Sequence, residues 1–475
     1  MSALWTSADA VQATAGTTTK DWTANGVSID TRTLQSGDLF VALKDVRDGH
    51  DFLRQAFDAG ASAALVTHVP DDAPDDRPYL IVPDVLEGLV ALGKAARART
   101  QARVLAITGS VGKTSTKEMA RTALKRQGKI HAAEASYNNH WGVPLTLARM
   151  PQDTDYAIIE IGMSNPGEIA PLSQLAAPDV ALVTTVAPAH LASFESIVGI
   201  AEEKAAILEG LQPGLGVGIL NADIETASIL EDTAQRLGAQ AIWFGKSETA
   251  DWQLRDAQMS EDSTQLMAQV EGAPLLFKLS APGAHYGLNG LAVLAACQAM
   301  GADLTQSVLD LGTWSPPGGL GTRELITLDP AHRDRVFTLI DDAFNANPAS
   351  LSAALDVFAV LQPRDLEGEV MRGRHIAILG DMLELGETEA ELHAAIADHP
   401  AIAKIAQVHC VGPRMKALWD VLPRSKRGLY AERVEDLMPS LKDLIMPGDI
   451  VLVKGSKGSR VSAAVDGLRK LGQAD

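Results

Sequence analysis

Cysteine is almost missing from this 475-residue sequence. The two cysteines, Cys297 and Cys410, stand far apart and match no metal-binding or redox spacing. A small secreted domain stapled by disulfides is therefore excluded, and we expect a reducing, cytosolic setting.

Blocks of basic residues are also missing. The chain has 41 lysines and arginines against 60 aspartates and glutamates, a formal net charge of −19. This charge balance argues against nucleic acid as the main partner, because binding a phosphate backbone requires a basic surface. Binding of a single nucleotide remains compatible with the negative charge, since a nucleotide needs only a local positive site.

Long apolar runs are missing as well. The most apolar helix candidate, residues 288–300 (LNGLAVLAACQAM), is shorter than the roughly 20 residues that a membrane-spanning helix needs. The opening residues MSALWTSADA have neither the basic nor the apolar region of a signal peptide. We therefore expect a cytoplasmic protein without a transmembrane segment, in which residues 288–300 form a buried helix.

The length predicts about three domains, because one hydrophobic core does not grow to this size. Apolar strand-like runs alternate with helical stretches, which predicts the α/β class. We predict a small α/β domain at 1–98, a parallel-sheet domain at 99–318 and a second, Rossmann-like α/β domain at 319–475. The Pro- and Gly-rich SPPGG at 315–319 is the predicted linker.

The stretch ITGSVGKTSTKE, residues 107–118, has the features of a phosphate-binding loop. It follows an apolar strand-like run and opens a stretch of helix formers, so backbone N–H groups and the positive helix end would meet an anion. Only Ser110 and Val111 separate Gly109 from Gly112, whereas the common loop has four residues there.

The loop's side chains favour a nucleoside triphosphate, most simply ATP. Lys113 can reach the β- and γ-phosphates, and the Thr114 hydroxyl can bind Mg²⁺. An ordinary turn with a stray lysine is the plain alternative, but strand, glycines, Lys-Thr and helix are all in register. The residues assigned to the nucleotide are Gly109, Ser110, Val111, Gly112, Lys113, Thr114 and Ser115.

Two polar residues end or follow neighbouring strand-like runs. Glu160 ends YAIIE, and His190 lies just beyond VALVTTV. A helix-capping glutamate and a solvent-facing histidine are the plain alternatives. If both strands flank the loop strand, however, the two side chains converge on the phosphates, where Mg²⁺ accepts oxygen ligands.

Three further residues are ambiguous on their own. Lys204 in AEEKAAILEG has the context of an ordinary solvated helix face. The adjacent amides Asn138 and Asn139 in SYNNHWGVP fit either a turn or a polar contact to a substrate.

The motifs TGSVGKTS, SYNN, EIGMSNPGEI, HLASF, AEEKAAIL, DDAFNANPASLSAAL, LGDMLELG and VKGSKGSR, in this order, resemble the Mur ligase family. IDTRTLQSGDLFVAL and DGHDF extend the resemblance into the first domain. The shortened phosphate loop is the family's own form. DDAFNANP and LGDMLELG are similar to the branch that adds D-alanyl-D-alanine.

The resemblance implies an ATP-dependent ligase. It would join D-alanyl-D-alanine to UDP-N-acetylmuramoyl-tripeptide through an acyl phosphate, giving the pentapeptide precursor of peptidoglycan. The first domain would bind the UDP substrate, the second would bind ATP, and the third would close on ATP and bind the dipeptide. A monomer is expected. Alternatives are another Mur ligase, a folylpolyglutamate synthetase-like enzyme, or a nucleotide-dependent switch.

The resemblance also implies residue roles. Lys113, His190 and Lys204 would be catalytic, and two Mg²⁺ ions would lie at Thr114, Glu160, His190 and Lys204, with Lys204 carbamylated. The remaining contacts would be Asn289 to adenine, Arg323 to phosphate, Asp342 to ribose, Thr31, Arg32 and His50 to UDP, and Asn138 and Asn139 to substrate. Leu320, Phe344 and Tyr286 depart from the family pattern, which puts single nucleotide contacts in question.

Overall fold

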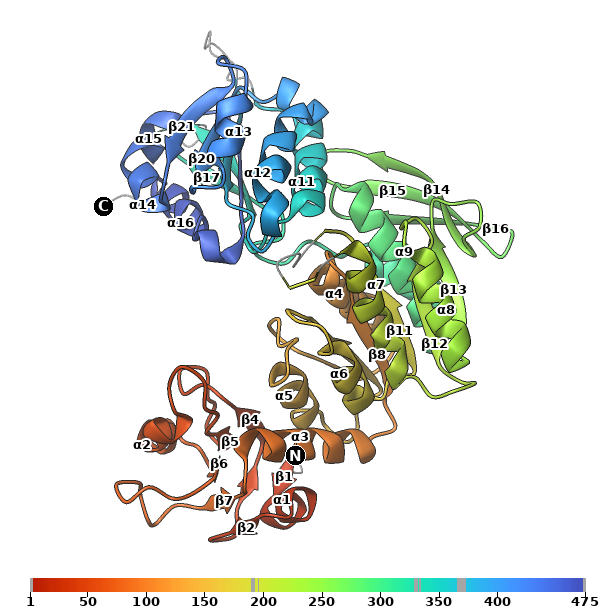
Figure 1. The fold of residues 1–475 in the computed structure, drawn as a ribbon, viewed down its shortest axis with the longest axis vertical. Coiled ribbons are helices and arrows are strands. Elements are labelled where there is room, and N and C mark those ends of the chain that lie inside the picture. Colours follow the sequence, from red (N-terminus) through yellow and green to blue (C-terminus); the bar gives the residue numbers. More distant parts are fainter. Residues whose placement is uncertain are drawn as a thin grey trace.

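The computed structural model describes residues 3–188, 193–194, 196–328, 332, 335–364 and 373–472. The chain forms three units, and each is built around its own main sheet. The three units follow one another in an arc (Figure 1). Within the described ranges, no helix is both long enough and apolar enough to cross a bilayer.

The first unit is built on a five-stranded sheet in the order β2-β7-β6-β5-β4. Strands β5 and β6 are wholly buried, which fits their apolar sequences DLFV and AALV. The strands are β1 (Trp5–Thr6), β2 (Thr17–Thr18), β3 (Thr23–Ala24), β4 (Gly26–Ser28), β5 (Asp38–Val41), β6 (Ala63–Val66) and β7 (Tyr79–Ile81). The helices are α1 (Ser7–Thr14), α2 (Leu53–Asp58) and α3 (Val85–Ala98).

The central unit contains a nine-stranded sheet in the order β16-β15-β14-β13-β12-β11-β8-β10-β9. Strands β9 to β13 run parallel with β8, and β14 to β16 form the antiparallel extension expected from the polar strand-like pieces. The strands are β8 (Arg103–Thr108), β9 (Ile130–Ala132), β10 (Tyr156–Glu160), β11 (Val180–Val183), β12 (Val217–Asn221), β13 (Gln240–Gly245), β14 (Trp252–Met259), β15 (Thr264–Val270) and β16 (Ala273–Leu279).

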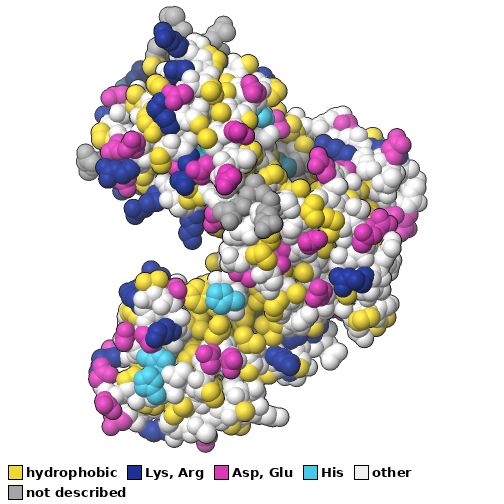
Figure 2. Space-filling view, in the orientation of Figure 1, with side chains coloured by type: hydrophobic (Ala, Val, Ile, Leu, Met, Phe, Trp, Pro, Cys, Tyr) yellow, Lys and Arg dark blue, Asp and Glu magenta, His cyan; other side chains and the backbone are white. Residues whose placement is uncertain are grey.

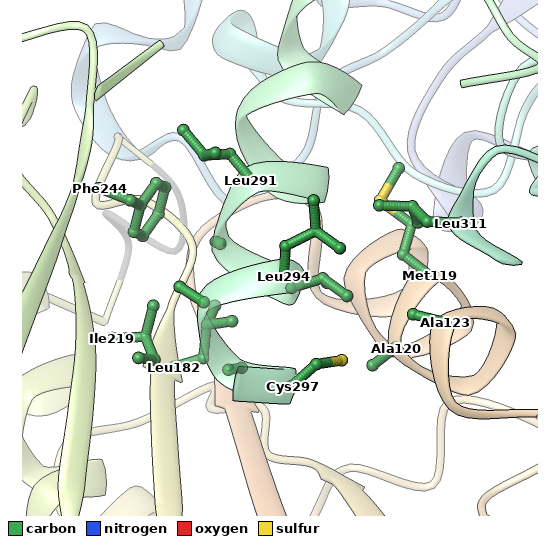
Figure 3. Close-up of a cluster of buried hydrophobic side chains, with 14 of the residues drawn as sticks. Met119, Ala120, Ala123, Leu182, Ile219, Phe244, Leu291, Leu294, Cys297 and Leu311 are labelled. Carbon is green, nitrogen blue, oxygen red and sulfur yellow. The ribbon is translucent and has the colours of Figure 1, made fainter. Parts of the chain in front are cut away.

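Helices cover both faces of the central sheet. They are α4 (Lys113–Leu124), α5 (Gly142–Ala148), α6 (Ile169–Ala176), α7 (Ile197–Ala205), α8 (Ala227–Leu237), α9 (Ala284–Ala299) and α10 (Leu304–Leu311). Figure 3 shows α9 in an apolar cluster, with Leu291 on the side of Phe244 of β13 and with Met119 of α4 and Leu311 of α10 on the other side. The buried helix expected from residues 288–300 is therefore confirmed, apart from an earlier start.

The third unit has a six-stranded sheet in the order β17-β18-β22-β19-β20-β21, parallel except for β17. Its strands are β17 (Thr322–Thr327), β18 (Val336–Asp342), β19 (His375–Gly380), β20 (Gln407–Val411), β21 (Arg427–Ala431) and β22 (Ile450–Lys454). Its helices are α11 (Pro348–Val360), α12 (Glu389–Ala394), α13 (Lys416–Val421), α14 (Val434–Leu437), α15 (Leu441–Leu444) and α16 (Ser462–Lys470).

The α/β class is confirmed. The domain boundaries stay predictions, although α3 ends at Ala98 and the segment between α10 and β17 contains the Pro- and Gly-rich linker. The first two units also share a core, because Leu145 and Ala148 of α5 pack into the cluster around the first sheet. The condition on which Glu160 and His190 would converge, that their strands flank the loop strand, is met, since β8 lies between β10 and β11.

Candidate active site

A cavity of about 840 Å³ lies between the central and third units. Its central wall carries the phosphate loop with Glu160 and Asn289, and its third-unit wall carries Asp342 and Lys454. A wider hollow opens between the first and third units (Figure 2). Both walls of the cavity bring strand ends together, which is where open α/β sheets place ligands.

The loop after β8 is shaped by two glycines with positive φ. At Gly109 (φ +148°) a Cβ atom would lie 1.9 Å from Thr184 Oγ1 of the neighbouring segment, and at Gly112 (φ +85°) it would lie 2.7 Å from the Asn289 amide. Side chains are therefore excluded at both positions. The Thr184 hydroxyl also donates to the Val111 carbonyl (2.6 Å). The loop is thus held in one conformation at the start of α4.

Lys113 is the first residue of α4 and lines the cavity. Its ammonium donates to the Gly109 carbonyl (2.6 Å) and so closes back over the loop. Desolvation lowers the pKa of Lys113, and the charge of Glu160 acts in the opposite direction. A cation held at a helix N-terminus is suited to binding phosphate oxygens.

Glu160 ends β10 and is 2 % exposed. Its carboxylate accepts hydrogen bonds from the Thr114 hydroxyl (3.1 and 3.2 Å) and from the Asn138 amide (2.8 Å). Carboxylate and hydroxyl oxygens next to a phosphate loop fit Mg²⁺, which fills its remaining positions with phosphate oxygens and water. The described residues contain no group of three or more His, Cys, Asp and Glu side chains that could bind a metal by themselves.

Lys117 is a residue that the sequence analysis missed. It is 1 % exposed, and its ammonium donates to the Ala133 carbonyl (2.8 Å) and lies 3.9 Å from Glu160. Lys117 therefore supports Glu160 and the segment that leads to Asn138. Its spacing from Lys113, one helical turn, was the available signal.

Lys204 of α7 is 1 % exposed, so the interpretation of it as a solvated helix face is wrong. The neighbouring Glu203 accepts from the backbone N–H groups of Gly167 and Ile169, and this turns the helix face inward. The Lys204 amine contacts the Met163 sulfur (3.7 Å). Burial, and then the charge of Lys113, hold the pKa of Lys204 well below its usual value.

The third-unit wall contains a buried ion pair. Asp342 and Lys454 end the paired strands β18 and β22, and the Lys454 ammonium lies 2.9 Å from the carboxylate. Burial raises the pKa of Asp342, while Lys454 opposes the rise. Lys454 was missed, and its position at the end of DIVLVK was the signal for it. Arg323 of β17 also lines the cavity.

The remaining predicted residues lie in different places. Asn139 lines the cavity, but its side chain also accepts from the Gly142 N–H (2.9 Å) at the start of α5. Thr31, Arg32 and His50 are in the first unit and do not line the cavity. The Arg32 guanidinium binds Asp30, and both ring nitrogens of His50 have partners, Asp48 and Thr67. His190 lies outside the described residues.

Comparison with known proteins gives matches over most of the chain. Residues 107–297 match the Mur ligase middle domain, and residues 330–457 match the glutamate ligase domain of Mur ligases. The UDP-N-acetylmuramoyl-tripeptide–D-alanyl-D-alanine ligase of Bacillus subtilis is 33% identical over 94% of this chain and 93% of its own. The ligase of that name from Escherichia coli is 34% identical over 95% of each chain.

The chain belongs to the Mur ligase family.

A solved structure extends the match to the fold. MurF from Acinetobacter baumannii superposes with a TM-score of 0.82 at 26% identity and covers 98% of this chain and 99% of its own. In the present Mur ligase, the three departures from the family pattern, Tyr286, Leu320 and Phe344, all line the cavity. These departures are therefore gathered at the junction of the central and third units.

Proposed function

We propose that this Mur ligase is an ATP-dependent amide ligase that adds D-alanyl-D-alanine to UDP-N-acetylmuramoyl-tripeptide. The product is the pentapeptide precursor of peptidoglycan, and the reaction takes place in the cytoplasm. The observation that carries the proposal is the near full-length similarity to ligases of that name, at 33% and 34% identity. The cavity supports it, because the phosphate loop and the buried carboxylate of Glu160 lie opposite a second wall. That wall carries one negative and one positive side chain, Asp342 and Lys454.

The first step is phosphoryl transfer. A carboxylate oxygen of the tripeptide forms a bond to the γ-phosphorus of ATP while the bond from that phosphorus to the β–γ bridging oxygen breaks, giving an acyl phosphate and ADP. Lys113 and the loop amides bind the phosphates and compensate their charge. Thr114 and Glu160 would hold a Mg²⁺ ion, which neutralises phosphate charge when bound.

The second step forms the amide. The dipeptide amine attacks the acyl carbon, the bond from that carbon to the phosphate oxygen breaks, and phosphate leaves as the nitrogen loses its proton. Asp342 would bind the ribose, Asn289 the adenine and Arg323 a phosphate, so the two walls hold one nucleotide between them. Holding both reactants in place supplies much of the rate enhancement. His190 and a carbamylated Lys204 would serve a second Mg²⁺ ion.

The first domain would bind the UDP moiety through Thr31, Arg32 and His50, and Asn138 and Asn139 would face the substrate. The 80 % exposed side chain of Arg32 supports this role, because its guanidinium can reorient toward a diphosphate. We propose that the protein acts as a monomer.

The test is phosphate release with different substrates. We expect release from ATP only when UDP-N-acetylmuramoyl-tripeptide and D-alanyl-D-alanine are both present, one phosphate for each amide formed. Steady hydrolysis without the dipeptide would indicate a nucleotide-dependent switch instead. Release with a single amino acid other than glutamate in place of the dipeptide would indicate another Mur ligase. Release with glutamate would indicate a glutamate-adding enzyme, such as another Mur ligase or a folylpolyglutamate synthetase-like enzyme.

Substitution of the proposed metal ligand gives a second prediction. Glu160→Gln keeps the size of the side chain and its acceptor for Thr114 but removes the charge that Mg²⁺ requires. We expect activity to fall about a hundredfold, with a several-fold rise in the Mg²⁺ concentration for half-maximal rate. His190→Ala should raise the Mg²⁺ requirement in the same way. Unchanged Mg²⁺ dependence in both variants would contradict the shared metal site.

A further inference from the structure

The linker between the central and third units turns at one residue. It runs from Trp314, which is 2 % exposed in the central core, to Thr322, the first residue of β17. Gly319 and Gly321 have φ values of +76° and +90°, and Leu320 lies between them. Such glycines give the backbone a freedom that other residues lack, so the direction of the chain is set around Leu320.

The third unit binds the linker on both sides of Leu320. The Gly321 N–H donates to the Asp341 carbonyl (2.8 Å), and the Phe344 N–H donates to the Gly319 carbonyl (3.1 Å). These bonds fasten the linker to the end of β18, next to Asp342. The linker and the third-unit wall of the cavity are therefore expected to move together.

The central unit binds the same linker through Tyr286 of α9. The Tyr286 hydroxyl donates to the Leu320 carbonyl (2.7 Å). Among the described residues, this is the one hydrogen bond that joins residues up to 314 to residues from 315 onward. Within the described ranges, the Tyr286 phenol thus provides the one hydrogen bond from the central unit to the linker and the third unit.

Tyr286 is rigidly placed for this contact. It is 9 % exposed, and its ring packs edge-on against Trp314 (5.0 Å between centroids) and lies 3.9 Å from the ring of His285. Burial raises the pKa of Tyr286, so the hydroxyl stays a donor throughout the physiological range. Tyr286 therefore contacts both ends of the linker, Trp314 with its ring and Leu320 with its hydroxyl.

The helix that carries Tyr286 also touches the phosphate loop. Asn289, about one turn along α9, stands against Gly112. One rigid helix therefore contacts the loop on the central wall and, through Tyr286, the linker that leads to Asp342 and Lys454. The relative position of the two cavity walls is set through this contact.

We propose that Tyr286 is a positioning residue for the nucleotide, which holds the linker so that both cavity walls meet one ligand. The proposal rests on the proposed function only in that the cavity binds a nucleotide. A buried hydrogen bond of this kind corresponds to roughly a three- to tenfold change in affinity.

The experiment compares three full-length proteins: wild type, Tyr286→Phe and the control Tyr430→Phe. Tyr430 lies in β21, away from the cavity lining, and its hydroxyl has no hydrogen bond with any described residue. Isothermal titration calorimetry gives the Kd for MgADP, and small-angle X-ray scattering gives the radius of gyration without nucleotide. Thermal unfolding checks that each variant is folded.

For Tyr286→Phe we expect a Kd for MgADP raised about three- to tenfold. We also expect a larger radius of gyration without nucleotide and a Tm close to that of wild type, while Tyr430→Phe matches wild type throughout. An unchanged Kd would overturn the proposal. A raised Kd with an unchanged scattering profile would overturn it too, because the hydroxyl would then contact the nucleotide directly. Failure of wild type to bind MgADP would instead contradict the proposed function.

Discussion

Lys113→Ala should reduce the rate of amide formation by roughly a thousandfold or more, which corresponds to about 4 kcal/mol of transition-state stabilisation. The lysine lines the cavity at the start of α4, and its ammonium bends back over the phosphate loop to the Gly109 carbonyl. In the proposed reaction, its charge would therefore lie where negative charge passes to the leaving ADP. Steady-state kinetics with saturating substrates measures the effect.

The control for this variant is Lys129→Ala, which removes a lysine whose side chain is 68% exposed and paired with Asp153 on the surface. Surface pairs of this kind contribute little, so this variant should keep wild-type activity. If Lys113→Ala kept more than roughly a tenth of wild-type activity, the loop would not be the site of phosphoryl transfer.

The sequence predicts the frame of the site well because that frame depends on local patterns. The sequence has a continuous apolar run before the shortened glycine loop, another that ends in Glu160 and a third before His190. Such runs are typical of buried parallel strands, so each predicts a strand and its end. The order of the strands stays a condition in the sequence, and the structure meets it by placing β10 and β11 beside β8. Thr114 and Glu160, which the resemblance assigns to Mg²⁺, lie within hydrogen-bond distance because of that order of strands.

The buried lysines were not predictable in the same way. Lys117 and Lys204 have the context of solvent-facing helix residues, and only tertiary packing places them inside. Lys117 donates hydrogen bonds to backbone carbonyls beyond β9, and Glu203 accepts from N–H groups just before and at the start of α6. Backbone groups leave no signature in the sequence. Helical spacing places Lys117 on the side of Lys113, but it cannot show that Lys117 or Lys204 is buried.

The contact between Tyr286 and Leu320 was also hidden, for a related reason. Both residues depart from the family pattern, and in the sequence each puts a separate nucleotide contact in question. The structure shows that the phenol of one binds the backbone of the other. A bond to a main-chain carbonyl depends on where the linker runs, which a motif does not record.

Lys204→Ala should lose activity by about a hundredfold or more, and formate or acetate should restore part of it. The Lys204 side chain is 1 % exposed, and burial together with the charge of Lys113 lowers the pKa of its amine. A neutral amine is the form that reacts with carbon dioxide to give a carbamate. The carbamate would put a carboxylate in place of the buried amine, and a carboxylate is an oxygen ligand that Mg²⁺ accepts.

Two variants separate this role from that of a simple cation. Lys204→Arg keeps a positive charge but cannot be carbamylated, so it should stay inactive and should not respond to formate. Lys113→Ala would remove a proposed phosphate-binding charge, so formate should not rescue it either. In addition, ¹³C-bicarbonate should give a carbamate NMR signal in the wild-type protein that is missing from Lys204→Arg. A Lys204→Arg variant as active as wild type would show that the site needs a cation at this position, because a guanidinium supplies charge and no oxygen ligand.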